Sequence, residues 1–172
     1  AQRFNHRYGD VFPEPMAFNF GETLLKVPSL DGTGKMSKSE NQMATLYLAD
    51  DDESIRKKLM KAVTGEAPAE KNSVMPDSVA NLFLLMELVS TQEVIAQYKN
   101  DYSNCRIRFG DMKKQLAEDM VKFIAPIRQK ANSILADENY LEKIMRQGAE
   151  KARKSANASM ELVRQAMGLK YF

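Results

Sequence analysis

The residues best suited to chemistry lie in one short glycine-rich stretch, residues 32–39. This stretch holds two lysines, Lys35 and Lys38, and two serines, Ser37 and Ser39, within five positions. Lysine ammonium groups on long stems can follow phosphate oxygens that gain charge during a reaction, and hydroxyl groups add hydrogen-bond donors. The two glycines before them permit turn conformations and a close approach to a ligand. These residues suit a loop that binds a phosphate-bearing substrate. Short motifs match by chance, however, so from the residues alone a solvated lysine-rich loop is the favoured interpretation.

The same stretch carries a resemblance to a known family. Lys35-Met36-Ser37-Lys38-Ser39 matches the KMSKS signature of class I aminoacyl-tRNA synthetases. The segments 27–31, 46–48, 55–58, 62–64 and 148–168 resemble the corresponding segments of bacterial tryptophanyl-tRNA synthetases. The resemblance therefore extends over nearly the whole chain, from residue 3 to residue 168.

The resemblance implies a set of site residues and ligands. The expected ATP-binding residues are Val27, Lys35, Met36, Ser37, Lys38 and Ser39, of which Lys35, Lys38 and Ser39 are expected to act in catalysis. The expected substrates of the full-length enzyme are tryptophan, ATP with Mg2+, and tRNA(Trp). The amino-acid carboxylate attacks the α-phosphorus and pyrophosphate leaves, so catalysis rests on positioning and on stabilising charge at phosphate oxygens. The resemblance also implies a homodimer.

Two family features are missing from these 172 residues. Class I synthetases also carry a HIGH signature that holds ATP, and the single histidine of this chain, His6, does not follow the strand-to-glycine pattern of that signature. The Gly-Glu-Asp type loop that the family uses on the ribose is also missing. We therefore interpret the chain as a C-terminal portion of the enzyme and expect it to be inactive alone.

Two alternatives stay open at this point. A portion of a tyrosyl-tRNA synthetase would share the architecture and a related lysine loop, although the segment 148–168 argues against it. A non-catalytic tRNA-binding module is the other alternative, in which the signature loop would be inherited from an enzyme and have no catalytic role. The residues themselves do not decide the amino acid, because the side-chain pocket of this family lies upstream of these residues.

Composition narrows the class of protein. A chain with 44% hydrophobic residues can bury a core, and no apolar run approaches the roughly 18 to 20 residues of a membrane span. The single cysteine, Cys105, permits no internal disulfide and fits a cytoplasmic protein. We expect no bound metal other than the Mg2+ of ATP, because the acidic run 50–53 fits a helix start better than a calcium loop.

The charges are divided between the two parts of the chain. Residues 1–105 contain 11 Lys and Arg against 15 Asp and Glu, whereas residues 106–172 contain 14 against 8. The basic part is expected to meet a polyanion. Candidate tRNA-binding residues are Arg106, Arg108, Lys113 and Lys114, around a loop and the first turn of a helix. Nearby, Tyr102 and Phe109 either stack on bases or anchor the loop on the core.

The pattern of apolar residues predicts a mainly α-helical chain in two domains. Residues 1–64 are expected to form the end of a Rossmann-like α/β nucleotide-binding domain, with a short buried strand at 24–27 leading to the signature loop. Residues 65–172 are expected to form an α-helical anticodon-binding bundle. A loop with Gly65 and Pro68 separates them.

Capping residues and periodicity locate the helices. Asp77 or Ser78 is expected to begin one helix, Thr91 a shorter one that reaches Tyr98, and Asp111 a long one that contains Pro126. A last helix should run from about residue 137 to 168. Its inward stripe is expected to be Leu141, Ile144, Gly148, Ala152, Ser155, Ser159, Leu162 and Ala166.

Overall fold

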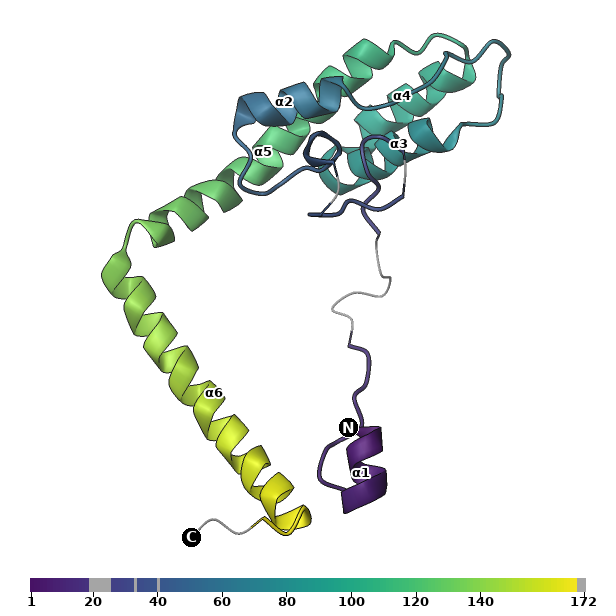
Figure 1. Cartoon of the computed structure of the whole chain (residues 1–172). Helices are drawn as coiled ribbons and strands as arrows, with labels where there is room; N and C mark the ends of the chain where they lie inside the picture. The colour runs from purple at the N-terminus through teal and green to yellow at the C-terminus, as the bar shows by residue number, and fades with distance from the viewer. Residues whose placement is uncertain (19–25, 33, 40, 170–172) are drawn as a thin grey trace. The chain divides into compact units, whose positions relative to one another are not determined.

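The computed structural model describes residues 1–18, 26–32, 34–39 and 41–169. These residues form α-helices joined by loops and contain no named strand, so the prediction of a mainly α-helical chain is confirmed. The helices are α1 (Gln2–Tyr8), α2 (Asp52–Met60), α3 (Asp77–Val89), α4 (Gln92–Ser103), α5 (Phe109–Leu135) and α6 (Glu138–Ala166), with a 3-10 turn at Gln42–Ala44 (Figure 1). The strand expected at 24–27 falls partly outside the described residues.

The chain divides into two compact units. One unit is Leu25–Asn132, and the other combines Ala1–Leu24 with Ser133–Phe172. Every buried residue among those described lies in the first unit, between Pro28 and Ile124. The expected domain boundary at residues 64 and 65 stays a prediction.

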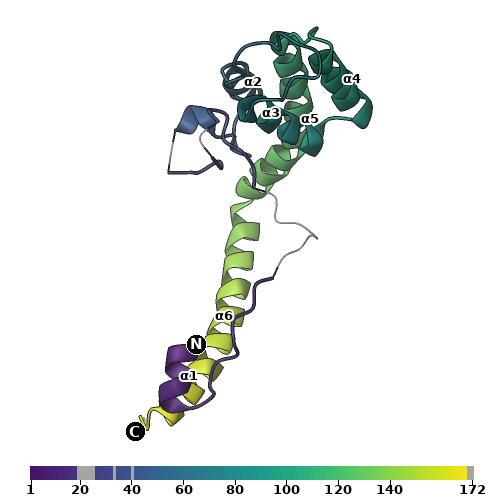
Figure 2. The same ribbon diagram turned by 90° about the vertical axis from the view of Figure 1, so that its right-hand side faces the viewer.

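The core of the first unit is built by α2, α3, α4 and α5, which lie together in both views (Figure 2). Residues three or four apart on each helix share one face, so apolar side chains at these spacings converge. The largest fully buried side chains are Ile55, Leu59, Val79, Leu82, Leu85, Met86, Met112 and Leu116. The predicted burial of α3 is confirmed at five positions: Val79, Leu82, Phe83, Leu85 and Met86.

Two of the helix starts carry aspartate caps. Asp51 accepts a hydrogen bond from the amide of Ser54 at 2.6 Å, and Asp137 accepts one from the amide of Tyr140 at 2.9 Å. The bond from Ser54 also holds the pKa of Asp51 below its usual value, because it stabilises the ionised carboxylate. The helix-start interpretation of residues 50–53 is therefore confirmed.

The expected start of α3 is wrong. Pro76 occupies the cap position, and the hydroxyl of Ser78 donates instead to the carbonyl of Thr64 at 2.9 Å. Proline at a helix start costs little, because the first amides of a helix have no partner within it. The helix therefore begins without a side-chain cap.

The helices α4 and α5 are longer than expected. The helix α4 continues to Ser103, and α5 begins at Phe109, which places Asp111 in its first turn rather than at its cap. Pro126 lies inside α5 without ending it. The buried residues of α5 all precede this proline, and the last of them is Ile124.

The last helix, α6, has no buried residue along its 29 positions. Most of the stripe expected to face inward is exposed, with Ile144 at 45% and Leu162 at 53% of full accessibility, and its two ends, Leu141 and Ala166, are half-buried. The expectation of an inward stripe is wrong for the described chain, although the expected cap at Asp137 is correct.

Candidate active site

The signature loop begins as a tight hairpin. The amide of Met36 donates to the carbonyl of Val27 at 2.9 Å, and the amide of Ser29 donates to the carbonyl of Gly34 at 2.9 Å. The turn between them requires glycine, because Gly32 has a φ of 78° and Gly34 has a φ of 110°. The hairpin thus places Val27 directly beside the signature residues.

The body of the chain holds this hairpin at its turn. Leu30 is 4% exposed and belongs to the core. Its amide donates to the carbonyl of Ala44 at 2.9 Å, and its carbonyl accepts from the amide of Val63 at 2.9 Å. The hydroxyl of Ser29 donates to the carboxylate of Asp31 at 2.8 Å. The signature residues therefore project from a fixed base.

The two signature lysines are exposed to solvent. Among the described residues, no hydrogen bond or ion pair involves the ammonium group of Lys35 or Lys38. The hydroxyls of Ser37 and Ser39 lie 3.1 Å apart, within hydrogen-bond distance of each other. One exposed ammonium group, that of Lys35, lies in the anchored hairpin, and the other, that of Lys38, lies two residues beyond its last bond. Together they form a cationic edge that suits an anionic ligand.

A hollow of about 450 Å³ lies against this edge. Its walls are formed by two segments, residues 36–38 and residues 45–49. The first segment contains three of the predicted ATP-binding residues. The second contains Thr45 and Tyr47, which sequence reasoning did not assign to the site, although the family resemblance did include residues 46–48.

Two residues of the acidic run at the start of α2 form ion pairs with basic side chains of the same unit. The ammonium group of Lys58 lies 2.6 Å from a carboxylate oxygen of Asp50, and Arg128 of α5 pairs with the carboxylate of Asp52. Lys58 is only 7% exposed. Among the described residues, no three His, Cys, Asp or Glu side chains gather closely enough to hold a metal ion.

The candidate tRNA-binding residues differ in exposure. Arg106, Arg108 and Lys114 are exposed, whereas Lys113 is half-buried, and burial lowers the pKa of its ammonium group. Because α5 begins at Phe109, both lysines lie beyond its first turn.

The two aromatic neighbours anchor the loop rather than present a stacking surface. Tyr102 is 3% exposed, and its hydroxyl donates to the carbonyl of Val74 at 3.4 Å. Phe109 is half-buried and packs against the core. The buried ring of Tyr102 therefore has no open face for a base.

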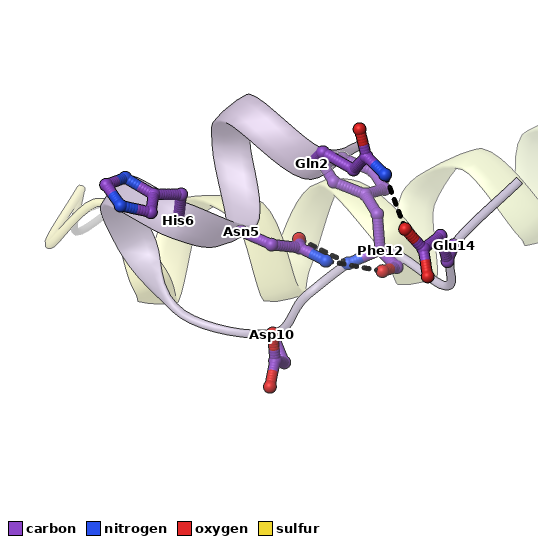
Figure 3. Close-up of a pocket in the computed structure, with 6 residues that line it drawn as sticks. All are labelled: Gln2, Asn5, His6, Asp10, Phe12 and Glu14. Carbon is purple, nitrogen blue, oxygen red and sulfur yellow. Dashed lines mark hydrogen bonds between the residues drawn. The ribbon is translucent and has the colours of Figure 1, made fainter.

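A second hollow, of about 520 Å³, lies beside α1 and contains none of the predicted site residues (Figure 3). The side chain of Asn5 accepts from the amides of Val11 and Phe12, at 3.2 and 3.0 Å, and donates to the carbonyl of Phe12 at 2.6 Å. His6 is exposed and points away from these bonds. The side-chain amide of Asn5 therefore stabilises the turn after α1 through these three hydrogen bonds.

The arrangement of hairpin, cationic edge and helical body agrees with a family match. The model for "tRNA synthetases class I (W and Y)" matches residues 1–125, and the chain belongs to this family. The resemblance stated from the KMSKS signature is thereby confirmed at the level of the family.

The relatives make the match more specific. A protein named tryptophan–tRNA ligase from Porphyromonas gingivalis is 50% identical over 171 residues, covering 99% of this chain and 52% of the relative. A tryptophan–tRNA ligase from Chlamydia caviae is 33% identical and is covered to 48%. The chain spans about half the length of the curated relatives it matches.

Solved structures agree. The tryptophanyl-tRNA synthetase from Campylobacter jejuni, complexed with ADP and tryptophan, superimposes with a TM-score of 0.74 at 26% identity. The match covers 98% of this chain and 51% of that one. None of the described helices is long and apolar enough to cross a membrane.

Proposed function

We propose that this chain supplies the signature loop and the helical region of a tryptophan–tRNA ligase, which as a whole protein joins tryptophan to tRNA(Trp) with ATP. The main observation behind the proposal is an anchored hairpin followed by the rest of the signature loop, with exposed ammonium groups at Lys35 and Lys38. The 50% identity to a tryptophan–tRNA ligase over 99% of the chain supports tryptophan as the amino acid.

In the proposed reaction, charge moves onto the pyrophosphate as the tryptophan carboxylate attacks the α-phosphorus of ATP. Lys35 and Lys38 stabilise that charge, and Ser37 and Ser39 donate hydrogen bonds to phosphate oxygens. Mg2+ arrives with ATP as part of the substrate. The glycines of the loop let it close over ATP and open again.

The base of ATP is proposed to lie near Val27 and the backbone of Met36. The carbonyl of Val27 already accepts one bond from the amide of Met36 at 2.9 Å. A carbonyl oxygen has two lone pairs, so this oxygen can still accept a bond from an adenine amino group. The hairpin therefore presents a second acceptor position at its open end.

The helical region is proposed to engage tRNA through Arg106, Arg108, Lys113 and Lys114. Residues 1–64 would form the end of the catalytic domain, and residues 65–172 the anticodon-binding domain. The proposed assembly is a cytoplasmic homodimer of the whole protein. The support for the tRNA surface is the excess of 14 Lys and Arg over 8 Asp and Glu in residues 106–172.

The test is ATP–pyrophosphate exchange by the whole protein. Lys38→Ala is expected to lower the turnover of tryptophan activation about a hundredfold with little change in ATP binding, because the lost charge acts mainly in the transition state. Lys71→Ala, at an exposed lysine far from the signature in sequence, is the matched control. Normal turnover with only a raised Michaelis constant for ATP would contradict the role of Lys38.

The same assay separates the alternatives. Exchange with tyrosine in place of tryptophan identifies a tyrosyl-tRNA synthetase, and tRNA binding without any exchange identifies a non-catalytic module. The 172-residue chain tested alone is expected to show no exchange.

A further inference from the structure

One buried threonine connects the helical body to the signature loop. Thr45 is 5% exposed. Its hydroxyl donates to the carbonyl of Ser37 at 3.1 Å, and its own carbonyl accepts from the ammonium group of Lys58 at 2.9 Å. These two hydrogen bonds therefore connect three segments: the signature loop at Ser37, the turn before α2 at Thr45, and α2 at Lys58.

The ammonium group of Lys58, which bonds to Thr45, also contacts two other residues of the same segment. It lies 2.6 Å from a carboxylate oxygen of Asp50 and 4.7 Å from the ring centre of Tyr47. The same carboxylate oxygen accepts the amide of Tyr47 at 2.9 Å. The segment from Thr45 to Asp50 therefore wraps around a single buried cation, and its backbone has little freedom to shift.

A second helix braces this segment. The guanidinium group of Arg128, on α5, donates to the backbone carbonyl of Asp50 and to the carboxylate of Asp52. Both α2 and α5 therefore fix the position of the segment that contains Thr45.

The signature residues themselves have few other attachments. The hairpin bonds end at Met36, and Ser37 and Ser39 are bonded to each other. Among the described residues, the bond from Thr45 joins residues 37–39 to the rest of the chain. It acts on a backbone carbonyl one residue before Lys38.

We propose that Thr45, oriented by Lys58, is a positioning residue for the signature loop. The hydroxyl of Thr45 sets the place of the Ser37 backbone and thereby the place from which Lys38 reaches the phosphates of ATP. This inference rests on the proposed function for its catalytic consequence, whereas the attachment of the loop is a property of the chain itself. A merely structural threonine would only satisfy its own buried hydroxyl.

The first experiment measures the attachment without activity. Trypsin cleaves after exposed lysines, so the rates of cleavage after Lys35 and Lys38 in the whole protein report how often the loop opens. Thr45→Val, which keeps the shape but removes the hydroxyl, is expected to raise both rates about fivefold, in line with the loss of one hydrogen bond. Thr45→Ser, which keeps the hydroxyl, is expected to restore the wild-type rates.

Cleavage after Lys71 is the internal control, because Lys71 is exposed and lies in the connection between α2 and α3. A rise at all three lysines would mean general unfolding and would overturn the proposal. Unchanged cleavage after Lys35 and Lys38 in Thr45→Val would overturn it as well.

The second experiment measures the catalytic consequence. Thr45→Val is expected to lower the turnover of tryptophan activation about tenfold, with Thr45→Ser near the wild type. In the Lys38→Ala background, Thr45→Val is expected to have little further effect, since it acts through Lys38. Equal effects in both backgrounds would overturn the proposal, because a structural defect would not depend on Lys38.

The lysine offers a further check with a matched control. Lys58→Met keeps the stem but removes the ammonium group, whereas Lys57→Met changes the neighbouring exposed lysine on the same helix. Loop cleavage is expected to rise only in the first variant. If the wild-type protein shows no exchange with tryptophan, the proposed function fails, while the cleavage rates still support or refute the attachment.

Discussion

The two compact units each contain a long amphipathic helix, but the two helices differ in how many residues they bury. In Leu25–Asn132, the part of α5 before Pro126 buries six residues against the other helices. In the other unit, α6 is two residues longer than α5 and buries none. Apolar periodicity therefore predicts which residues share a face, but burial depends on a neighbouring surface that periodicity does not reveal.

The largest expected effect comes from replacing one leucine on each of the two long helices and comparing the loss of stability. Leu116 of α5 is fully buried, and Leu162 of α6 is 53% exposed. Leu116→Ala is expected to lower the free energy of unfolding by about 3 to 4 kcal/mol, because it leaves a cavity in the core. Leu162→Ala should change it by less than about 0.5 kcal/mol. Denaturant titration of the 172-residue chain measures both, and similar losses would show that α6 has a covered face.

A second test compares the basic residues of the two units. Arg106→Gln with Arg108→Gln in the whole protein is expected to weaken tRNA binding about tenfold and to flatten its salt dependence, by roughly 0.7 in log–log slope for each phosphate interaction that is removed. Phosphate contacts carry little sequence information, so the weakening should be similar for different tRNAs. The comparison pair is Lys151→Gln with Lys154→Gln on α6. If only this second pair weakens binding, the tRNA surface lies on α6 instead.

A third test uses the glycine in the middle of α6. Among the described residues, nothing lies within 4 Å of where a side chain would begin at Gly148. Gly148→Ala is therefore expected to raise the free energy of unfolding of the 172-residue chain by about 0.5 to 1 kcal/mol, because alanine loses less backbone entropy. Gly32→Ala should have the opposite sign, since Gly32 has a φ of 78°. A loss of stability in Gly148→Ala would indicate close packing at α6.

The smallest expected effect concerns the cap of α2 in the core unit. The amide of Ser54 lowers the pKa of Asp51 from its usual 3.8. A carboxylate with a lowered pKa stabilises the fold above that usual value, and the contribution is lost as the pH falls through the lowered pKa. Asp51→Asn keeps a capping oxygen but cannot titrate. Its stability is expected to fall less steeply with acid than that of the wild type, as measured by thermal unfolding between pH 5 and 3, at roughly one-half unit steps.

Local patterns predicted the local features of this fold. The five buried positions of α3 follow from its apolar spacing, and the cap at Asp137 follows from its residue type and position. The cap expected at Asp77 or Ser78 failed because Ser78 bonds to Thr64, which is distant in sequence. Propensity cannot anticipate such a competing partner.

The same limit applies to the candidate site. The signature residues were identifiable from their types and spacing, whereas the bond between the amide of Met36 and the carbonyl of Val27 appears only in the structure, and the ATP-binding role of Val27 stays a prediction. The attachment through Thr45 and Lys58 was not identifiable, because each partner is an ordinary residue whose role depends on a contact 8 or 13 positions away. Contacts of this kind can be identified only from a three-dimensional structure.

Pro126 gives α5 a property that its continuous ribbon does not suggest. A proline has no backbone N–H, so one hydrogen bond is missing from the middle of the helix. Before this point the helix is packed in the core, and after it none of the described residues is buried. Amide hydrogens in the two halves should therefore exchange with solvent at different rates, slowly before Pro126 and faster after it. One helix in the structure would then open as two separate cooperative units in solution.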